Sequence, residues 1–156
     1  SYMAGAFSHS VFEPVEHRWT HGQFFGPPST DGAWFELYRN MLVHERDDGA
    51  LILGMAVPRV WLADGKQIEV ERCPTYYGNL SMTIASEANT GRITASVAMQ
   101  GGTHPTELIV RLRHPEGKPI RSVSVNGRPW TEFDVAKEWI RIRRPDEAKY
   151  QIVASY

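Results

Sequence analysis

The spacing of apolar residues predicts one helix in the first third of this chain. In the segment STDGAWFELYRNMLVHERDDG, residues 29–49, apolar side chains recur every three or four positions. That interval places them on one stripe of a helix, formed by Trp34, Leu37, Tyr38, Met41 and Leu42. Thr30 or Asp31 can cap its start, and the DDG turn is expected to end it. A β-strand through MLVHE is the alternative at the C-terminal end.

The segment before this helix has a different character. Residues 4–29 are rich in aromatic and turn residues and keep neither a helical nor a strand period. This composition predicts an extended arm that lies against another surface. We therefore expect residues 1–50 to form an N-terminal arm and a connector helix, and residues 51–156 to form a separate domain.

The second region carries the pattern of short, half-buried strands. A continuous apolar run, ALILGMAV, opens it, and PRVWLADG is typical of one helical turn that Trp61 and Leu62 fix to the domain. Most later segments alternate apolar and polar residues, as in GRITASVAM and ELIVRLRHP, and Asn126-Gly127 predicts a two-residue hairpin loop. Seven or eight such strands without intervening helices predict a mainly β fold. Its expected form is an antiparallel two-sheet β-sandwich, jelly-roll-like.

The overall composition gives no reason to expect a nucleic-acid or membrane partner. The 17 Lys and Arg residues nearly balance 18 Asp and Glu residues, so nothing favours nucleic acid or an acidic lipid surface. No apolar run approaches the roughly 20 residues that span a bilayer, and no export signal is visible. The pattern indicates a soluble chain, with Ser1 and Tyr2 resembling vector residues before Met3. A single cysteine excludes an internal disulfide and favours a cytoplasmic location.

Reactive side chains do not form a recognisable catalytic or metal-binding pattern. His17 and His21 are four residues apart, but no third ligand accompanies them, so we interpret them as loop residues. Cys73 is expected to be a packing thiol. Glu69 and Glu71 share one face of a strand, which is typical of a solvated edge and not of a glycosidase acid pair. The sequence thus predicts no catalytic residue, no metal and no cofactor.

Aromatic residues are the remaining candidates for binding. Trp and Tyr rings stack on sugar rings, and a shallow platform of them characterises noncatalytic carbohydrate-binding modules. The candidate residues are Tyr76, Tyr77, Trp130 and Trp139. Trp139 is out of phase with Ile140 and Ile142, which favours an exposed position. The alternative is that these large rings anchor the core.

The order of several short motifs carries a family resemblance. They are L-I-L-G, V-P-R-V-W-L, P-T-Y-Y-G-N-L-S, R-L-R-H-P and V-S-V-N-G. Over residues 34–156 this series resembles the C-terminal region of large bacterial glycosidase-like proteins built on a six-hairpin (α/α)6 toroid, of the α-L-rhamnosidase type. The resemblance implies that the catalytic acid and base lie in the toroid, and that the β-sandwich packs on it as an accessory domain.

Three functional hypotheses follow from the motifs and the resemblance. The first is a noncatalytic accessory β-sandwich that caps and stabilises a catalytic toroid, which this chain does not contain. The second is an autonomous carbohydrate-binding module, and the third is a small self-associating protein of unrelated function. An enzyme in its own right is the weakest interpretation, because a complete glycosidase active site would need the toroid.

The helical stripe generates a first prediction. If Trp34, Leu37, Tyr38 and Met41 form an interdomain or self-association face, the isolated chain should expose an apolar surface and associate into a dimer or larger species. Light scattering measures this directly, and a monomer at high protein concentration would contradict the prediction.

Overall fold

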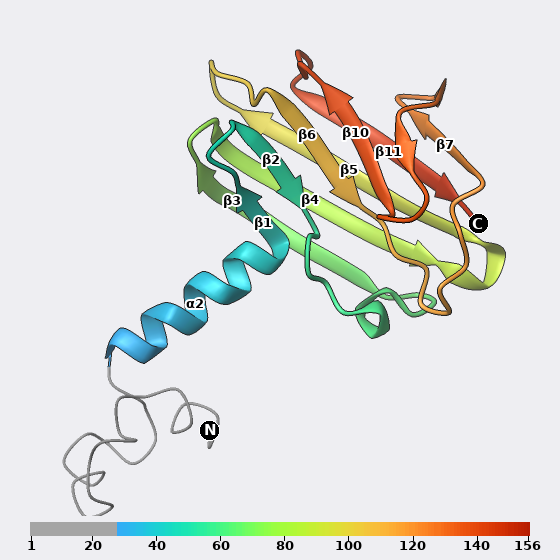
Figure 1. Ribbon diagram of the computed structural model, residues 1–156, viewed down its shortest axis with the longest axis horizontal. Helices are drawn as coiled ribbons and strands as arrows, with labels where there is room; N and C mark the ends of the chain where they lie inside the picture. The colour runs from blue at the N-terminus through green and yellow to red at the C-terminus, as the bar shows by residue number, and fades with distance from the viewer. Residues whose placement is uncertain (1–27) are drawn as a thin grey trace, which may run out of the picture. The chain divides into compact units, whose positions relative to one another are not determined.

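The computed structural model describes residues 28–156, with side chains from Trp34 onward (Figure 1). The chain divides into two compact units, Ser1–Asn40 and Met41–Tyr156. Most of the predicted arm, together with His17 and His21, lies outside the described residues. The division between a first region ending at residue 50 and a second starting at 51 stays a prediction. Within the described residues, no helix is both long enough and apolar enough to cross a membrane.

The predicted helix is present as α2, Pro28–Leu42, but it ends earlier than expected. The chain leaves it directly into strand β1, Val43–Glu45, so the strand through MLVHE, which was the alternative, is correct at its last three residues. β1 pairs antiparallel with β2, Ala50–Leu53. The DDG residues form the turn between these strands, where Gly49 has a φ of 83° and the Asp48 side chain accepts a hydrogen bond from the Ala50 amide. Pairing of β1 with β2 therefore overrides the helical propensity of this segment.

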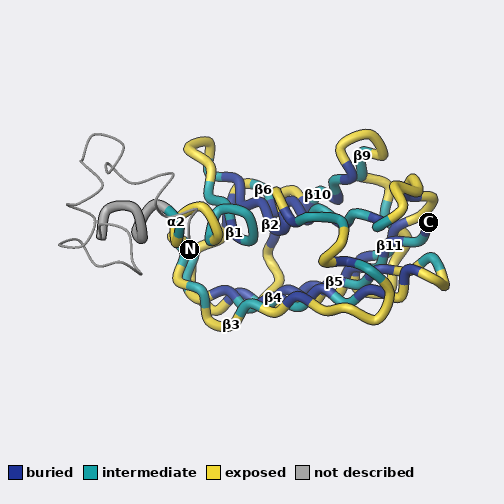
Figure 2. The backbone as a smooth tube through the Cα atoms, turned by 90° about the horizontal axis from the view of Figure 1, so that it is seen from below, coloured by how far each residue is buried: buried dark blue, intermediate teal, exposed yellow. Residues whose placement is uncertain are grey.

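The second unit consists of two β-sheets. The first has the strand order β1-β2-β6-β10-β9, and the second has the order β3-β4-β5-β11-β7-β8. Figure 2 shows them as two layers, with buried positions along both. The remaining strands are β3 Gln67–Thr75, β4 Gly78–Glu87, β5 Arg92–Gln100, β6 Glu107–Arg111, β7 Ser122–Val125, β8 Arg128–Trp130, β9 Phe133–Asp134, β10 Trp139–Arg143 and β11 Lys149–Ser155. The predicted two-sheet β-sandwich is confirmed.

One strand pair departs from the antiparallel pattern. β2 and β6 run parallel, with Leu51 opposite Leu108 and Leu53 opposite Val110. Parallel neighbours need a long crossover. Here the chain supplies it by leaving the first sheet after β2, building β3, β4 and β5 in the second sheet, and returning at β6. The short 3-10 helices η3, Arg59–Leu62, and η4, Ala88–Thr90, lie within this crossover.

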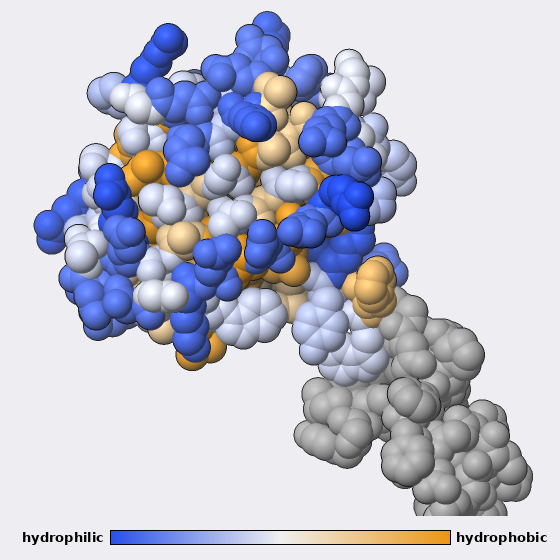
Figure 3. Space-filling model, turned by 180° about the vertical axis from the view of Figure 1, so that it is seen from behind, coloured by the Kyte–Doolittle hydropathy of each residue, from blue (hydrophilic) through white to orange (hydrophobic). Residues whose placement is uncertain are grey.

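Alternation along the strands places the core between the two sheets. Ile93, Ala95 and Val97 of β5 are fully buried, whereas Ser96 between them is exposed. The same rule puts Leu108 and Val110 of β6 in the core cluster. The face in Figure 3 is largely hydrophilic, with apolar positions showing between the polar ones. The predicted Asn126-Gly127 loop joins β7 to β8, and both of its residues have positive φ, as a type I′ turn requires.

The burial of β6 generates a second prediction. Leu108→Ala should lower the free energy of unfolding by about 2–5 kcal/mol, because it removes a fully buried side chain from a packed core. The matched control Ser96→Ala, at an exposed strand position, should change it by no more than about 0.5 kcal/mol. Urea titration of the two variants checks both values. Equal effects would mean that the alternation does not define the core.

Candidate functional site

The tyrosine pair lies at the turn between β3 and β4. Tyr76 is 86% exposed, and its backbone N–H donates a hydrogen bond to the Glu45 side chain at 2.6 Å. Tyr77 is half-buried, and its hydroxyl donates to the Gly49 carbonyl at 2.8 Å. Burial raises the pKa of the Tyr77 phenol, and the carboxylates of Glu45 and Asp48 raise it further. Tyr77 therefore ties two turns together, and only Tyr76 presents a free ring.

The two tryptophans occupy different environments. Trp130 packs against the core, and its indole N–H donates to the Arg141 carbonyl at 2.9 Å, which links β8 of one sheet to β10 of the other. Trp139 is half-buried on β10. The Lys137 ammonium lies 5.0 Å and the Arg141 guanidinium 5.5 Å from its ring centroid, within the range of a cation–π contact.

The structure does not bring these four aromatic residues onto one surface. Trp139 stands opposite Arg111, at the C-terminal end of β6. Tyr77 bonds to Gly49, the residue before Ala50, which stands opposite Glu107 at the N-terminal end of β6. The tyrosine pair and Trp139 thus lie toward opposite ends of the same strand, and Trp130 is an anchor between the sheets.

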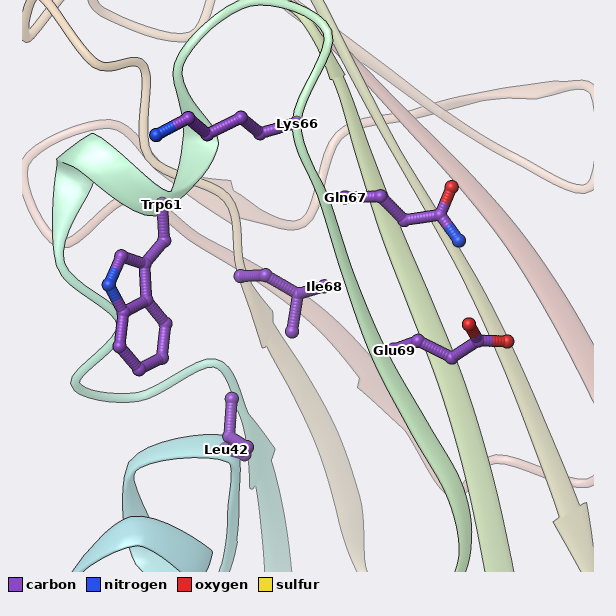
Figure 4. Close-up of a pocket in the computed structure, with 6 residues that line it drawn as sticks. All are labelled: Leu42, Trp61, Lys66, Gln67, Ile68 and Glu69. Atoms are coloured by element: carbon purple, nitrogen blue, oxygen red, sulfur yellow. The ribbon is translucent and has the colours of Figure 1, made fainter.

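A shallow apolar groove lies on the side of the sandwich where β3 forms the sheet edge (Figure 4). It has a volume of about 410 Å³, and its apolar lining comes from Leu42, Trp61 and Ile68. Lys66, Gln67 and Glu69 supply its polar lining. Figure 4 shows the Trp61 ring from η3 on the side of the groove facing Ile68. This groove is an open surface feature and not an enclosed chamber.

Trp61, which lines the groove, belongs to a segment with several exposed apolar side chains. Residues 54–62 follow β2 and include η3, and they carry Met55, Val60 and Trp61, which are 37%, 61% and 37% exposed. A 3-10 helix has three residues per turn, so Arg59 and Leu62 share one side of η3. Leu62 is fully buried, which turns Val60 and Trp61 outward. Of the two residues expected to fix this turn to the sandwich, Leu62 does so and Trp61 lies half-exposed in the groove.

Next to this segment, a buried carboxylate is surrounded by three arginines. The Glu138 side chain is 8% exposed, and its Oε1 lies 2.8 Å from Arg59 Nη1. Its Oε2 lies 3.2 Å from Arg113 Nε and 3.6 Å from Arg111 Nη2. Breaking a buried ion pair by removing one partner costs about 3–5 kcal/mol. We call these four residues the Glu138 cluster.

The arginines of the Glu138 cluster also hold backbone carbonyls. Arg111 Nη1 donates to the Met55 carbonyl at 2.8 Å, and Arg113 Nη1 donates to the Val57 carbonyl at 3.0 Å. The pKa of Arg111 is lowered, mainly because the side chain is partly buried and also because the positive charge of Arg113 is near. The cluster thus fastens the 54–62 segment to the end of β6. Sequence analysis missed it, although the motifs V-P-R-V-W-L and R-L-R-H-P contain all three arginines.

His114 and Tyr156 form a buried pair beside the cluster. His114 Nε2 lies 3.2 Å from the Ala88 carbonyl, while Nδ1 accepts a hydrogen bond from the Glu116 amide. The ring is therefore the neutral Nε2–H tautomer with both nitrogens satisfied. Its centroid is 5.1 Å from that of Tyr156, whose hydroxyl donates to the Leu112 carbonyl. This pair is structural. Between residues 28 and 156, no group of three potential ligands could hold a metal ion.

Comparison with known proteins finds likeness among solved structures. No protein family model matches the chain, and no curated protein matches it. A solved chain titled "Glycoside hydrolase" is similar over 87% of this chain, at 14% sequence identity and a TM-score of 0.47. This chain spans 21% of that protein's length. The likeness is to a glycoside hydrolase in general, and the α-L-rhamnosidase type stays a prediction.

Burial of Tyr156 generates a third prediction. Desolvation raises the pKa of its phenol well above the usual value of about 10, so the folded state favours the neutral form. Stability from this group is fully present below pH 10 and is lost as the pH rises further, because the unfolded chain ionises first. Urea midpoints at pH 8 and pH 11 measure the loss. The Tyr156→Phe variant should be less stable than the original chain at pH 8, and its stability should fall less between pH 8 and pH 11. A fall equal to that of the original chain would contradict the prediction.

Proposed function

We propose that this chain is a noncatalytic accessory β-sandwich of a carbohydrate-active protein, which packs on a helical catalytic domain and stabilises it. The observation that carries the proposal is the exposure of Met55, Val60 and Trp61 on one segment, with Trp61 also lining the groove. The motif order that resembles the C-terminal region of toroid glycosidases supports the same role. We name the exposed residues Met55, Val60 and Trp61, with the groove, the docking surface.

The shape and chemistry of the docking surface favour a protein partner. Sites for small molecules are concave and bury most of the ligand, whereas this groove is shallow and open. Clustered exposed apolar side chains mark interaction surfaces. Three apolar residues on one short segment, next to an apolar groove with a polar margin, fit the centre and rim of a domain interface. A helical surface with apolar ridges would bury them.

The carboxylates described give no support to catalysis by this chain. Glycoside hydrolysis needs two carboxyl groups that face each other across the scissile bond. Glu69 and Glu71 are exposed on the edge strand β3, and Asp47 and Asp48 lie in the β1–β2 turn. Glu138, the buried carboxylate of residues 28–156, is engaged by arginines through both oxygens.

A fourth prediction tests the docking surface. Trp61→Ser should markedly reduce binding of a hydrophobic dye by the isolated chain, because it removes the largest exposed ring of that surface. The free energy of unfolding should change by less than about 1 kcal/mol. Tyr76→Ser, which removes an exposed ring elsewhere, is the matched control and should leave dye binding nearly unchanged. A loss of more than about 2 kcal/mol in Trp61→Ser would identify Trp61 as a core residue and contradict the proposal.

A second candidate function, an autonomous carbohydrate-binding module, is favoured by two rings. Tyr76 is almost fully exposed, and Trp139 stands between Arg111 and Asp134 on neighbouring strands, so that a ring and hydrogen-bonding groups share one face. A glycan array separates the two functions. Absence of binding to any glycan on the array supports the accessory role. Binding that disappears in Trp139→Ala or Tyr76→Ala supports the carbohydrate-binding module. Hydrolysis of aryl glycosides by the isolated chain would contradict both.

A further inference from the structure

The Glu138 cluster carries more positive charge than its own carboxylate neutralises. Three guanidiniums surround one carboxylate, which leaves an excess of two positive charges in a partly buried place. The groups that face them from the packed elements are His114, which is neutral, and the Tyr156 phenol, whose pKa is raised. Neither compensates the excess. A partly buried cation without a counter-charge is an electrostatic complement for an anion.

The arginines of the cluster also have more N–H donors than the contacts within it use. A guanidinium has five N–H groups. Arg59 uses its Nη1 for Glu138 and for the His114 carbonyl, and Arg113 uses Nε and Nη1 for Glu138 and the Val57 carbonyl. Neither arginine uses its Nη2 group in these four contacts. These side chains are 34% and 22% exposed, so each is partly open to solvent.

The segment that these arginines hold in place also exposes apolar side chains. Val60, which follows Arg59, is 61% exposed, and Met55, whose carbonyl is held by Arg111, is 37% exposed. A carboxylate that is flanked by apolar side chains matches this combination of charge and apolar surface. Acidic residues at the rim of an apolar protein surface have that character, whereas a uronic acid presents hydroxyl groups beside its carboxylate.

We propose that Arg59 and Arg113 form a binding site for the carboxylate of an Asp or Glu side chain on the domain that covers the docking surface. This proposal rests on the proposed accessory role. Planar guanidiniums bind carboxylates through paired hydrogen bonds, which gives the contact direction as well as attraction. Glu138 would act as a positioning residue, because it fixes both guanidiniums and leaves their outer edges available.

The experiment titrates the chain with small carboxylates and observes the arginine side-chain N–H signals by NMR. The probes are sodium acetate and the α-amide of N-acetylglutamate, with sodium chloride at matched ionic strength as the reference. We expect saturable shifts of the Arg59 and Arg113 signals with both carboxylates, while Arg92, which is exposed on β5, follows the chloride curve. If the Arg59 and Arg113 signals shift with the carboxylates only as they do with chloride at the same ionic strength, the proposal is overturned.

Variants separate binding from folding. Arg59→Gln should weaken acetate binding at least tenfold, and Arg59→Lys should weaken it less, because lysine keeps the charge but loses the planar fork. Arg92→Gln is the matched control and should bind like the original chain. Glu138→Gln should weaken acetate binding, because it removes the charge that fixes both guanidiniums, and unchanged binding would contradict a positioning role for Glu138. Equal weakening by Arg92→Gln would overturn the proposal.

A last arm distinguishes the source of the carboxylate. Galacturonate carries one carboxylate on a sugar ring, and we expect it to bind no more tightly than acetate. Tenfold tighter binding of galacturonate would overturn the proposal in favour of an acidic glycan. Because these titrations use the isolated chain, their failure leaves the accessory role to be judged by the dye and glycan experiments.

Discussion

A carboxylate that is taken out of water must be neutralised and hydrogen-bonded, and this requirement at Glu138 organises one end of the sandwich. Arg59, Arg111 and Arg113 meet the requirement. Arg59 is distant in the chain from Arg111 and Arg113, so their convergence on Glu138 fixes the connection after β2 against the end of β6. Arginine suits this task because one guanidinium can bind the carboxylate and a backbone carbonyl at once.

The position of the docking surface follows from this arrangement. The carbonyls of Met55 and Val57 are held by Arg111 and Arg113, and η3 directs Leu62 into the core. Val60 and Trp61 are then left on the outside. An apolar surface presented by a fastened segment can bind a partner with little further loss of conformational entropy. That property agrees with a role in domain packing.

The other aromatic residues illustrate how a small sandwich uses large side chains. Trp130 and Tyr77 each donate a hydrogen bond to a backbone carbonyl, and their rings pack against the core. Trp139 lies beside two cations, and Tyr76 projects from a turn. Such a distribution presents single rings at separate places, whereas stacking on an extended glycan needs several rings along one face.

The sequence by itself determined the local features of this protein. Strand alternation identified the buried face of β5, and Asn126-Gly127 located a hairpin, because both depend on neighbours in the chain. Tertiary structure decided the rest. Only pairing with β2 ended the helix at Leu42, and only the crossover through the second sheet made β2 and β6 parallel. The Glu138 cluster and the exposure of Trp61 likewise depend on contacts between distant segments, which no periodicity records.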